Sequence, residues 1–222
     1  MNKTTARKPL NVLITAGPTR EYVDPVRFIS NASSGVTGFE LARSAAKNGA
    51  NVTLISGPVI IKPPEKVRVF FVGTALPMRK AVDKFIKKMD IFISSAAVCD
   101  WRPEHFWRRK IKKSSKILRI KLTKNPDILK SAAEKYHLTK TFVGFALETE
   151  NEIENAKNKL HRKKLDLIVA NAPENIGSGL ASGFILYPDG KIKEIKKCSK
   201  STFAKIIWKE IKKTHYDKRK KR

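Results

Sequence analysis

Cysteine is scarce in this sequence of 222 residues, and long apolar runs are absent. The two cysteines, Cys99 and Cys198, lie far apart and form no C-x-x-C pair, which argues against a disulfide framework and a cysteine-based zinc site. No apolar run is long enough to cross a bilayer, and residues 1–9 lack the apolar stretch of a secretory signal. We therefore expect a cytoplasmic protein without membrane contact.

Acidic residues are also few: 20 Asp and Glu stand against 47 Lys and Arg, giving a net charge of +27. The excess is concentrated in residues 108–124, which hold nine basic residues and no acid, and in residues 191–222, which hold 14 basic residues and three acids. A basic protein often binds anions or nucleic acid. Because lysine exceeds arginine and residues 214–222 read as a solvated basic tail, we expect anionic small substrates rather than a nucleic-acid partner.

A full G-x-G-x-x-G fingerprint is missing as well. Only Gly35-x-x-Gly38 is present, and Ser56-Gly57 stands at the end of the second predicted strand, where a dinucleotide-binding protein would carry an acid. A nicotinamide-dependent reductase is therefore disfavoured.

Apolar strand-like runs alternate with helical patterns along nearly the whole chain, which predicts an α/β protein with a mainly parallel sheet. The predicted strands are 11–15, 51–55, 67–72, 91–95, 117–122, 141–147 and 166–169, and a hairpin pairs 183–187 with 191–195. The predicted helices are 35–48, 75–88, 126–136, 150–162 and 200–212, with Pro126 in a first turn. We expect a Rossmann-like three-layer αβα domain over 10–213, ending in the hairpin and a helix, after a tail of residues 1–9.

The segment 29–38 separates the first predicted strand from the first predicted helix. Its Ser33, Ser34 and Gly35 open that helix, where unpaired N–H groups and the helix dipole favour an anion. Gly17 would let the neighbouring backbone come close. A serine N-cap on an ordinary helix explains the same residues. Both interpretations stay open on the turn alone.

Unusual residues follow four predicted strands, at the edge where ligands bind in open α/β sheets. They are 17–21 with the helix-opening turn, 96–102, 148–149 and Asn171. We expect these four loops to converge on one site.

Several multi-residue motifs resemble, in order and spacing, those of the phosphopantothenoylcysteine synthetase family, the ligases of coenzyme A synthesis. They are Thr15–Glu21, Asp24–Asn31, 33–35, 96–98 with Asp100, 110–113, 124–127, 143–146 with 148–149, and 165–171. This resemblance covers nearly the whole chain. It departs at Val36-Thr37, where members commonly have Lys-Met, and at Cys99, where alanine is usual.

The resemblance implies that 4′-phosphopantothenate is activated with CTP to an acyl-cytidylate, with Mg²⁺, and then joined to L-cysteine, giving 4′-phosphopantothenoylcysteine, CMP and pyrophosphate. ATP stays open as an alternative to CTP, and the metal ligands stay unknown. The first predicted strand begins about ten residues from Met1. The resemblance therefore suggests a stand-alone synthetase, without flavin, whose decarboxylase partner is encoded separately. It also implies a homodimer.

The resemblance assigns catalytic roles to three residues. Asn31 would touch the acyl group, Arg27 would position the acid or phosphate, and Lys110 would lie on a mobile basic lid over 106–124. A salt bridge between Arg27 and Asp24 is the structural alternative. Substrate binding is assigned to Arg27, Asn31 and Asn171.

Nucleotide binding is assigned by the same resemblance to a larger set: Gly17, Ser33, Ser34, Gly35, Ala96, Asp100, Lys124, Asn125, Pro126, Phe145, Lys159 and Lys163. Asp100 would bind the base or ribose, and Phe145 would pack on the base. Lys159 and Lys163 lie four apart and so share one helix face, which solvent exposure also explains. Residues 124–126 would form a second anion-binding helix start. A non-catalytic nucleotide- or nucleic-acid-binding protein on the same scaffold is the competing hypothesis.

Overall fold

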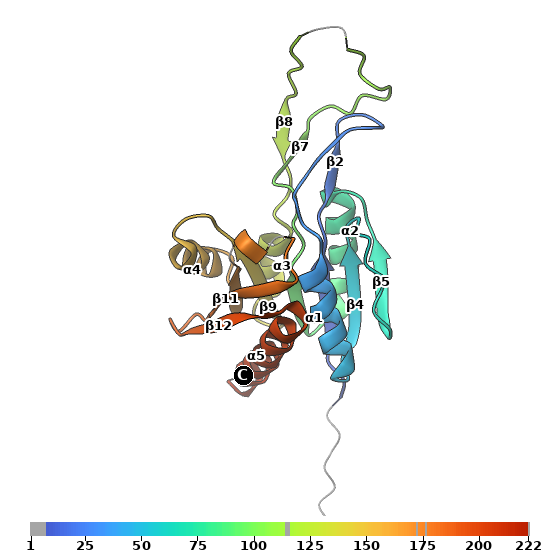
Figure 1. Ribbon diagram of the computed structural model, residues 1–222. Helices are drawn as coiled ribbons and strands as arrows, with labels where there is room; N and C mark the ends of the chain where they lie inside the picture. Colours follow the sequence, from blue (N-terminus) through green and yellow to red (C-terminus); the bar gives the residue numbers. More distant parts are fainter. Residues whose placement is uncertain (1–7, 114–115, 172, 176, 222) are drawn as a thin grey trace, which may run out of the picture.

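A single eight-stranded sheet forms the middle layer of the molecule (Figure 1). The computed structural model describes residues 8–113, 116–171, 173–175 and 177–221. The strand order is β12-β11-β10-β9-β6-β1-β4-β5, and all neighbours are parallel except the β10–β11 and β11–β12 pairs. The strands are β1 (Asn11–Ala16), β4 (Asn51–Ser56), β5 (Val67–Phe71), β6 (Ile91–Ser94), β9 (Thr141–Leu147), β10 (Leu167–Asn171), β11 (Leu180–Leu186) and β12 (Ile192–Ser199).

Two apolar cores lie on opposite faces of this sheet, because successive side chains of a strand point to opposite sides. In β1, Val12 and Ile14 belong to one core, and Leu13 belongs to the other. Helices α1 (Val36–Lys47) and α5 (Lys200–Lys220) cover the first face. The second face is covered by α2 (Ala75–Phe85), α3 (Ile128–Tyr136) and α4 (Glu152–Arg162). The predicted Rossmann-like αβα architecture is confirmed, including the hairpin and helix at its C-terminal end.

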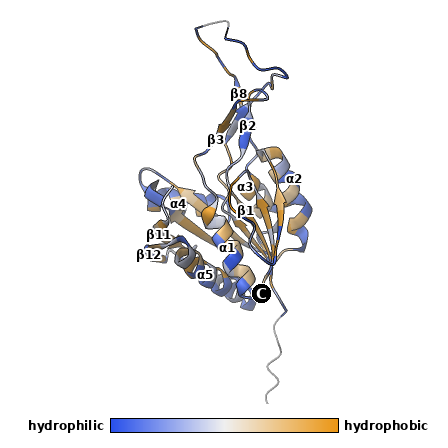
Figure 2. Cartoon of the chain, turned by 45° about the vertical axis from the view of Figure 1, so that its right-hand side comes forward, coloured by the Kyte–Doolittle hydropathy of each residue, from blue (hydrophilic) through white to orange (hydrophobic). Residues whose placement is uncertain are grey.

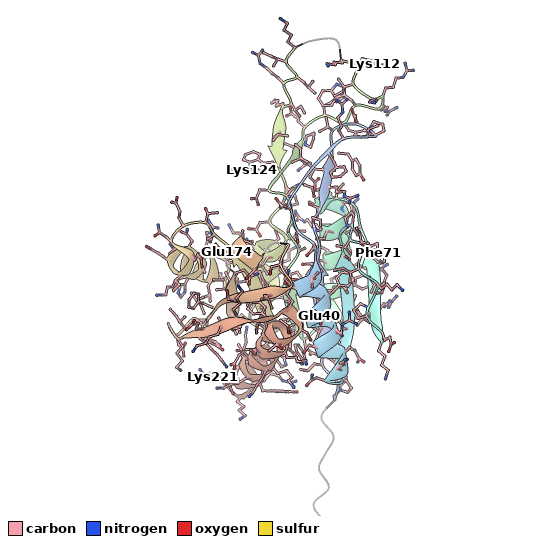
Figure 3. All side chains as sticks on the ribbon, in the orientation of Figure 1. Glu40, Phe71, Lys112, Lys124, Glu174 and Lys221 are labelled. Carbon is pink, nitrogen blue, oxygen red and sulfur yellow. The ribbon has the colours of Figure 1, made fainter. Side chains whose placement is uncertain are left out.

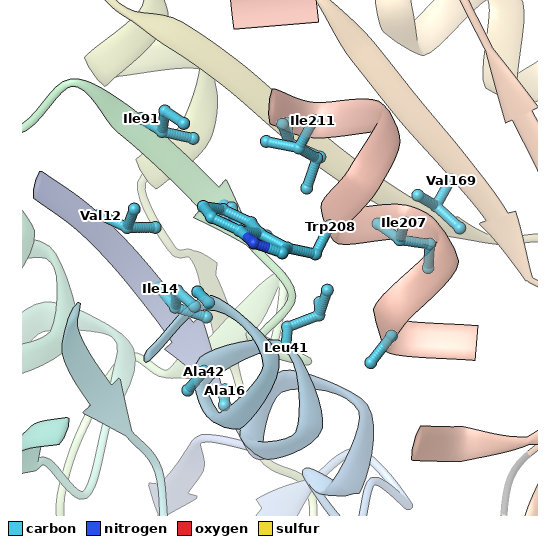
Figure 4. Packing of buried hydrophobic residues seen from close by; sticks show 14 of the residues in the cluster. Val12, Ile14, Ala16, Leu41, Ala42, Ile91, Val169, Ile207, Trp208 and Ile211 are labelled. Carbon is cyan, nitrogen blue, oxygen red and sulfur yellow. The ribbon is translucent and has the colours of Figure 1, made fainter. Parts of the chain in front are cut away.

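Trp208 of α5 packs between the sheet and α1 (Figure 4). Its side chain is 2% exposed and lies among Val12, Ile14, Leu41 and Ile91. Truncating a buried aromatic of this kind costs about 3–5 kcal/mol of unfolding free energy. The last helix therefore contributes directly to the central core.

Two antiparallel hairpins extend beyond the sheet as one projection (Figure 1). One pairs β2 (Arg20–Tyr22) with β3 (Phe28–Ser30), and the other pairs β7 (Trp101–Pro103) with β8 (Leu122–Lys124). We call residues 20–30 and 101–124, without 114 and 115, the arm. The Trp107 N–H donates to the Val23 carbonyl at 3.0 Å, which joins the two hairpins. Figure 3 shows Lys112 near the far end of the arm and Lys124 at its base.

The arm corrects one sequence prediction. A strand over 117–122 is wrong, because residues 117–121 do not have strand structure and pairing with β7 begins only at Leu122. Ile117, Leu118 and Leu122 are exposed on the arm. The predicted lid over 106–124 lies within this projection, and its mobility stays a prediction.

Two helix boundaries also differ from prediction. The predicted solvated tail over 214–222 is wrong, because α5 continues to Lys220 and buries His215. Residue 222 lies outside the described residues, as do residues 1–7 of the predicted N-terminal tail. Pro126 is not in a first helical turn, because α3 begins at Ile128 after the N-cap Asp127. The last turn predicted after α2 is the short 3₁₀ helix Ile86–Lys88. A second short 3₁₀ helix, Pro173–Asn175, follows β10.

Among the described residues, none of the helices combines the length and the apolar character needed to span a bilayer.

Candidate functional site

A cavity of about 450 Å³ opens at the carboxyl ends of the central strands. It lies where the strand order reverses, because β1 continues to β4 on one side while β6 and β9 follow on the other. Its walls come from 31–38 after β1, 95–98 and Asp100 after β6, 145–147 at the end of β9, and Asn171 at the end of β10. The expected convergence is observed for the helix-opening turn, for 96–98 with Asp100 and for Asn171, whereas residues 17–21 and 148–149 do not line the cavity.

The first wall is the start of α1. Its N-cap is Gly35, with φ of 78°, and no side chain caps the helix. The serine N-cap interpretation is therefore wrong. The Ser33 hydroxyl instead accepts a hydrogen bond from the Gly35 N–H at 3.3 Å, and the first turn contains no acid. Ser33, Ser34 and Gly35 thus present an uncapped helix start to the cavity, as an anion site requires.

Gly38 lets this helix start lie directly against the sheet. A Cβ at that position would come within 2.5 Å of the Ala16 Cβ and 2.6 Å of the Ser95 Oγ, so any larger residue would push α1 away. Gly17 does not line the cavity, but supports it from behind: a Cβ on Gly35 would come within 3.0 Å of the Gly17 Cα. The glycines thus fix the position of the uncapped helix start.

Four more of the predicted nucleotide-binding residues line the cavity: Ala96, Asp100, Phe145 and Lys159. Lys159 comes from α4 and is half-buried. Burial lowers its pKa, and the charge of Lys163 adds to that effect, whereas Glu148, Asp127 and Asp100 oppose it. A partly desolvated ammonium near one carboxylate and an aromatic ring suits a ligand that combines a ring with negative charge.

Asn31 and Asn171, two of the predicted substrate-binding residues, also line the cavity. The Asn31 Nδ2 donates to the Ala97 carbonyl at 3.1 Å, which orients its amide. Asn171 lines the same cavity from the end of β10, and its Oδ1 is buried without a hydrogen-bond partner among the described residues. Because a buried unpartnered amide oxygen is costly, a ligand donor at this position would stabilise it.

The structure does not bring Arg27 or Lys110 to the cavity. Arg27 binds Asp24 through Nε at 2.9 Å and through Nη2, as in the structural alternative, and Nη2 also donates to the Ile111 carbonyl at 2.9 Å. Lys110 is exposed on the arm, one residue before that contact. Their predicted catalytic roles stay predictions.

The helix that was predicted to begin at residues 124–126 begins later, at Ile128. The Asp127 carboxylate caps α3 by accepting from the Lys130 N–H at 3.0 Å, and it pairs with the Lys163 Nζ at 2.7 Å. Lys163 is thus held by Asp127 and does not line the cavity.

The residues just before α3 have structural contacts instead. Asn125 ties two loops together, because its Nδ2 donates to the Cys99 carbonyl at 2.9 Å. The Lys124 ammonium lies 5.5 Å from the centre of the Trp101 ring. Lys124, Asn125 and Pro126 are absent from the cavity wall, so their assigned roles in nucleotide binding stay predictions.

Three residues that the sequence did not single out also line the cavity: Ser95, Asn175 and Lys200. The Asn175 Nδ2 donates to the Ser182 carbonyl at 2.7 Å, so its amide braces β11. Lys200 opens α5 and is 7% exposed. It is one lysine in a lysine-rich segment, and only its packing separates it from the others.

Cys99 is buried, and burial raises the pKa of its thiol. Its Sγ lies 3.5 Å from the Thr19 carbonyl. A protonated, enclosed thiol is a poor nucleophile, as expected for a small packing residue.

No group of three or more His, Cys, Asp or Glu side chains in the described part of the chain could hold a metal ion. Asp100 is the one carboxylate among the described residues that line the cavity. A single carboxylate is compatible with Mg²⁺ that is bound mainly by substrate phosphates, which is its usual mode in nucleotide sites.

Comparison with known proteins agrees with this geometry. Residues 8–215 match the family model described as the DNA/pantothenate metabolism flavoprotein C-terminal domain. The chain is 43% identical over 223 aligned residues to the coenzyme A biosynthesis bifunctional protein CoaBC of Escherichia coli K12, covering 97% of this chain and 54% of that protein. It thus spans about half the length of the curated relatives it matches.

Two solved structures share the fold. The C-terminal domain of a CoaBC protein superposes with a TM-score of 0.81 at 36% identity, covering 94% of this chain and 96% of that chain. A Cab2 variant in complex with phosphopantothenate-cysteine has a TM-score of 0.76 at 18% identity, covering 94% and 87%, which shows a shared fold. The family predicted from the motifs is thereby confirmed: the chain belongs to the family of the DNA/pantothenate metabolism flavoprotein C-terminal domain, which includes the C-terminal domain of CoaBC.

Proposed function

We propose that this chain is a phosphopantothenate–cysteine ligase of coenzyme A synthesis. The observation that carries the proposal is one cavity that combines an uncapped helix start, two asparagine amides, an aromatic ring and two lysines. Relatives at 43% identity are named for coenzyme A biosynthesis, and a neighbour of the same fold is described with phosphopantothenate-cysteine. The cavity and these names support the same chemistry.

In the first step, an oxygen of the 4′-phosphopantothenate carboxylate attacks the α-phosphate of CTP, and pyrophosphate leaves. The start of α1 after Gly35 would bind phosphate oxygens through the N–H groups of its first turn, Val36 to Gly38, and Lys159 would add a positive charge. Phe145 and Asp100 would bind the base and ribose. Mg²⁺ would be held by the phosphates with help from Asp100. The choice of CTP over ATP rests on the family resemblance.

In the second step, the amine of L-cysteine attacks the acyl carbon, giving the amide and CMP. The Asn31 amide uses one N–H on the Ala97 carbonyl and has a second for the acyl oxygen. Asn171 would accept a hydrogen bond from the substrate through its unpartnered Oδ1. Both residues would act by orienting the acyl group and binding the charge that develops on oxygen.

Arg27 and Lys110 belong to the arm, so we propose that they act across a homodimer. Eight large apolar side chains of the arm are exposed: Tyr22, Val26, Phe28, Trp101, Phe106, Ile117, Leu118 and Leu122. Such a concentration of exposed apolar surface is typical of an interaction site. A second copy would cover it and could receive Lys110 at its cavity. A decarboxylase partner and a cytoplasmic location stay predictions.

The test is pyrophosphate release by the purified chain with Mg²⁺ and L-cysteine. We expect release that requires both 4′-phosphopantothenate and a nucleoside triphosphate, with CTP preferred when each triphosphate is supplied in turn. Absence of release under all these conditions would overturn the ligase proposal. Retention on duplex DNA at physiological salt without turnover would favour the nucleic-acid-binding alternative.

Lys110→Gln tests the arm in the same assay. We expect a loss of turnover of at least about 100-fold with an unchanged unfolding transition, because the variant removes a mobile cation and no packing. Lys112→Gln, two residues away on the same arm, is the control and should keep near-normal turnover. Full activity in Lys110→Gln would contradict the assigned role.

A further inference from the structure

Lys200 is a buried lysine whose backbone is firmly placed. It is the first residue of α5, directly after the N-cap Ser199, whose hydroxyl accepts from the Thr202 N–H at 3.1 Å. The Lys200 N–H donates to the Gly179 carbonyl at 3.2 Å, which ties this helix start to the residue before β11. Only 7% of Lys200 is exposed, and it lines the cavity that the start of α1 also lines.

The ammonium of Lys200 has no ion pair or hydrogen-bond acceptor within the part of the chain that the structure describes. Three other lysines of low exposure, Lys140, Lys163 and Lys218, are paired. The Lys140 Nζ donates to two backbone carbonyls, at 2.9 and 2.6 Å, and the Lys163 and Lys218 ammonium groups contact carboxylates at 2.7 and 2.5 Å. Burial lowers the pKa of Lys200, with no opposing interaction. Most of the Lys200 side chain is buried, whereas its ammonium is not fully enclosed and lies at the cavity without a partner among the described residues to compensate its charge.

The charges around the cavity indicate what would compensate this ammonium. Lys159 is a second cation on the wall, and the start of α1 contributes its free N–H groups and the positive end of its dipole. Asp100 is the single carboxylate on the described wall. A volume of about 450 Å³ is suited to a nucleotide-sized ligand. The cavity is thus prepared for an anion with several negative oxygens, and lysine binds phosphate as a compact point charge.

We infer that the Lys200 ammonium binds a phosphate group of the ligand in this cavity. The identity of that ligand rests on the proposed function, which offers two sources of phosphate: the triphosphate of CTP and the terminal phosphate of 4′-phosphopantothenate. α1 and α5 cover the same face of the sheet, so Lys200 approaches the cavity from the side of the α1 helix start. The two helix starts would hold one anion between them.

The experiment is calorimetric binding, without turnover, of inorganic pyrophosphate, CTP and 4′-phosphopantothenate, each alone. Lys200→Gln should lower the affinity for pyrophosphate, and for one of the two phosphate-containing substrates, at least about 10-fold. The affinities of Lys200→Arg should stay within about threefold of those of wild type. Lys205→Gln is the matched control, since Lys205 is exposed on the same helix. Weaker binding of CTP would show that Lys200 contacts the triphosphate. Weaker binding of 4′-phosphopantothenate would show that it contacts the phosphate of the acid substrate.

Urea unfolding of the unliganded proteins separates binding from structure. Because the Lys200 ammonium has no partner among the described residues, Lys200→Gln should be at least as stable as wild type, whereas a structural role predicts a loss of stability. Equal affinities of Lys200→Gln and wild type for all three ligands, or no binding of any of them to wild type, would overturn the inference. The ligase proposal is judged separately, by pyrophosphate release from wild type.

Discussion

Asp24 is a buried carboxylate on the arm that holds the chain beside Lys110. It accepts hydrogen bonds from the Val26 and Arg27 N–H groups, both at 2.9 Å, and from the Ile111 N–H at 3.2 Å, as well as from the Arg27 side chain. Arg27 completes the contact by donating to the Ile111 carbonyl. This pair therefore fixes the main chain one residue after the predicted catalytic lysine, and an effect of Arg27 on catalysis can act through Lys110.

Asp24→Asn tests this contact. Burial raises the pKa of Asp24, but the hydrogen bonds from Arg27, Val26 and Ile111 outweigh it and hold the pKa well below its ordinary value of 3.8. A lowered folded-state pKa means that the stabilisation is present above 3.8 and is lost as pH falls towards the folded value. We expect the variant to unfold at lower urea concentration at neutral pH, and to lose less further stability than wild type between about pH 5 and pH 2.5.

Asp83→Asn is the control for this experiment, because Asp83 forms only an exposed pair with Arg79 at 3.7 Å. It should change neither the stability nor its pH dependence. A pH profile of Asp24→Asn parallel to that of wild type would contradict the assigned role.

The lysines show which cavity-lining residues can be predicted from the sequence and which cannot. Lys159 matches a family spacing and lines the cavity, whereas Lys163 matches equally well and pairs with Asp127. Lys200 has no motif and lines the cavity. Spacing along one helix places two side chains on one face, but which of them meets a carboxylate depends on a helix elsewhere in the chain.

Helix α5 is longer than its sequence suggested, and its last turns are bound to the body. The Thr141 Oγ1 and the His215 Nδ1 lie 2.9 Å apart. The Lys218 Nζ contacts the Asp166 Oδ1 at 2.5 Å and donates to the Lys140 carbonyl at 2.8 Å. The basic composition of residues 214–222 predicted a tail because composition carries no information on these three partners. Thr141 lies in β9, Lys140 directly precedes β9, and Asp166 directly precedes β10.

Lys218→Met should destabilise the protein by about 1–3 kcal/mol, because it removes the ion pair with Asp166 and the hydrogen bonds to the His137 and Lys140 carbonyls while keeping the aliphatic packing. Lys220→Met, two residues further along an exposed part of the same helix, should change stability by less than about 0.5 kcal/mol. Equilibrium urea unfolding measures both. Equal midpoints for the two variants would show that the helix end contributes nothing to stability.

The arm is an element that local patterns predicted poorly. Ile117, Leu118 and Leu122 produced an apparent strand, but an isolated apolar segment becomes a strand only where another strand pairs with it. The pairs actually formed, β2 with β3 and β7 with β8, are three residues long. Such short strands give almost no periodic signal.

The whole molecule is a compact three-layer body with an exposed projection. In Figure 2 the strands of the sheet are mainly hydrophobic, and hydrophobic residues recur along the arm. A body of this kind can fold alone, whereas the exposed apolar side chains of the arm are explained by association with a second copy.

We expect a dimer at micromolar concentration in analytical ultracentrifugation. Leu118→Asp should weaken dimerisation at least about 10-fold, since Leu118 is 49% exposed on the arm. Ile60→Asp is the control, because Ile60 is 103% exposed but lies on the body between β4 and β5. A wild-type monomer at all concentrations, or equal effects of the two variants, would contradict an arm-mediated dimer.

The sequence by itself determined the αβα architecture, the C-terminal hairpin and the family. The periodicities of strands and helices are local properties of the sequence, and the order of motifs can be recognised without knowing any tertiary contact. The sequence also placed the turn at Ser33–Gly35, Asp100 and Asn171 at one edge of the sheet, where they line the cavity.

Only the tertiary structure decided which charges meet. It paired Arg27 with Asp24 and Lys163 with Asp127, kept Lys110 on the arm, and brought Lys200 to the cavity. The physical reason is that the free energy of a charged side chain depends on burial and on partners far away in the chain. In a chain with 47 basic residues, composition alone does not distinguish a solvated lysine from a lysine placed to bind an anion.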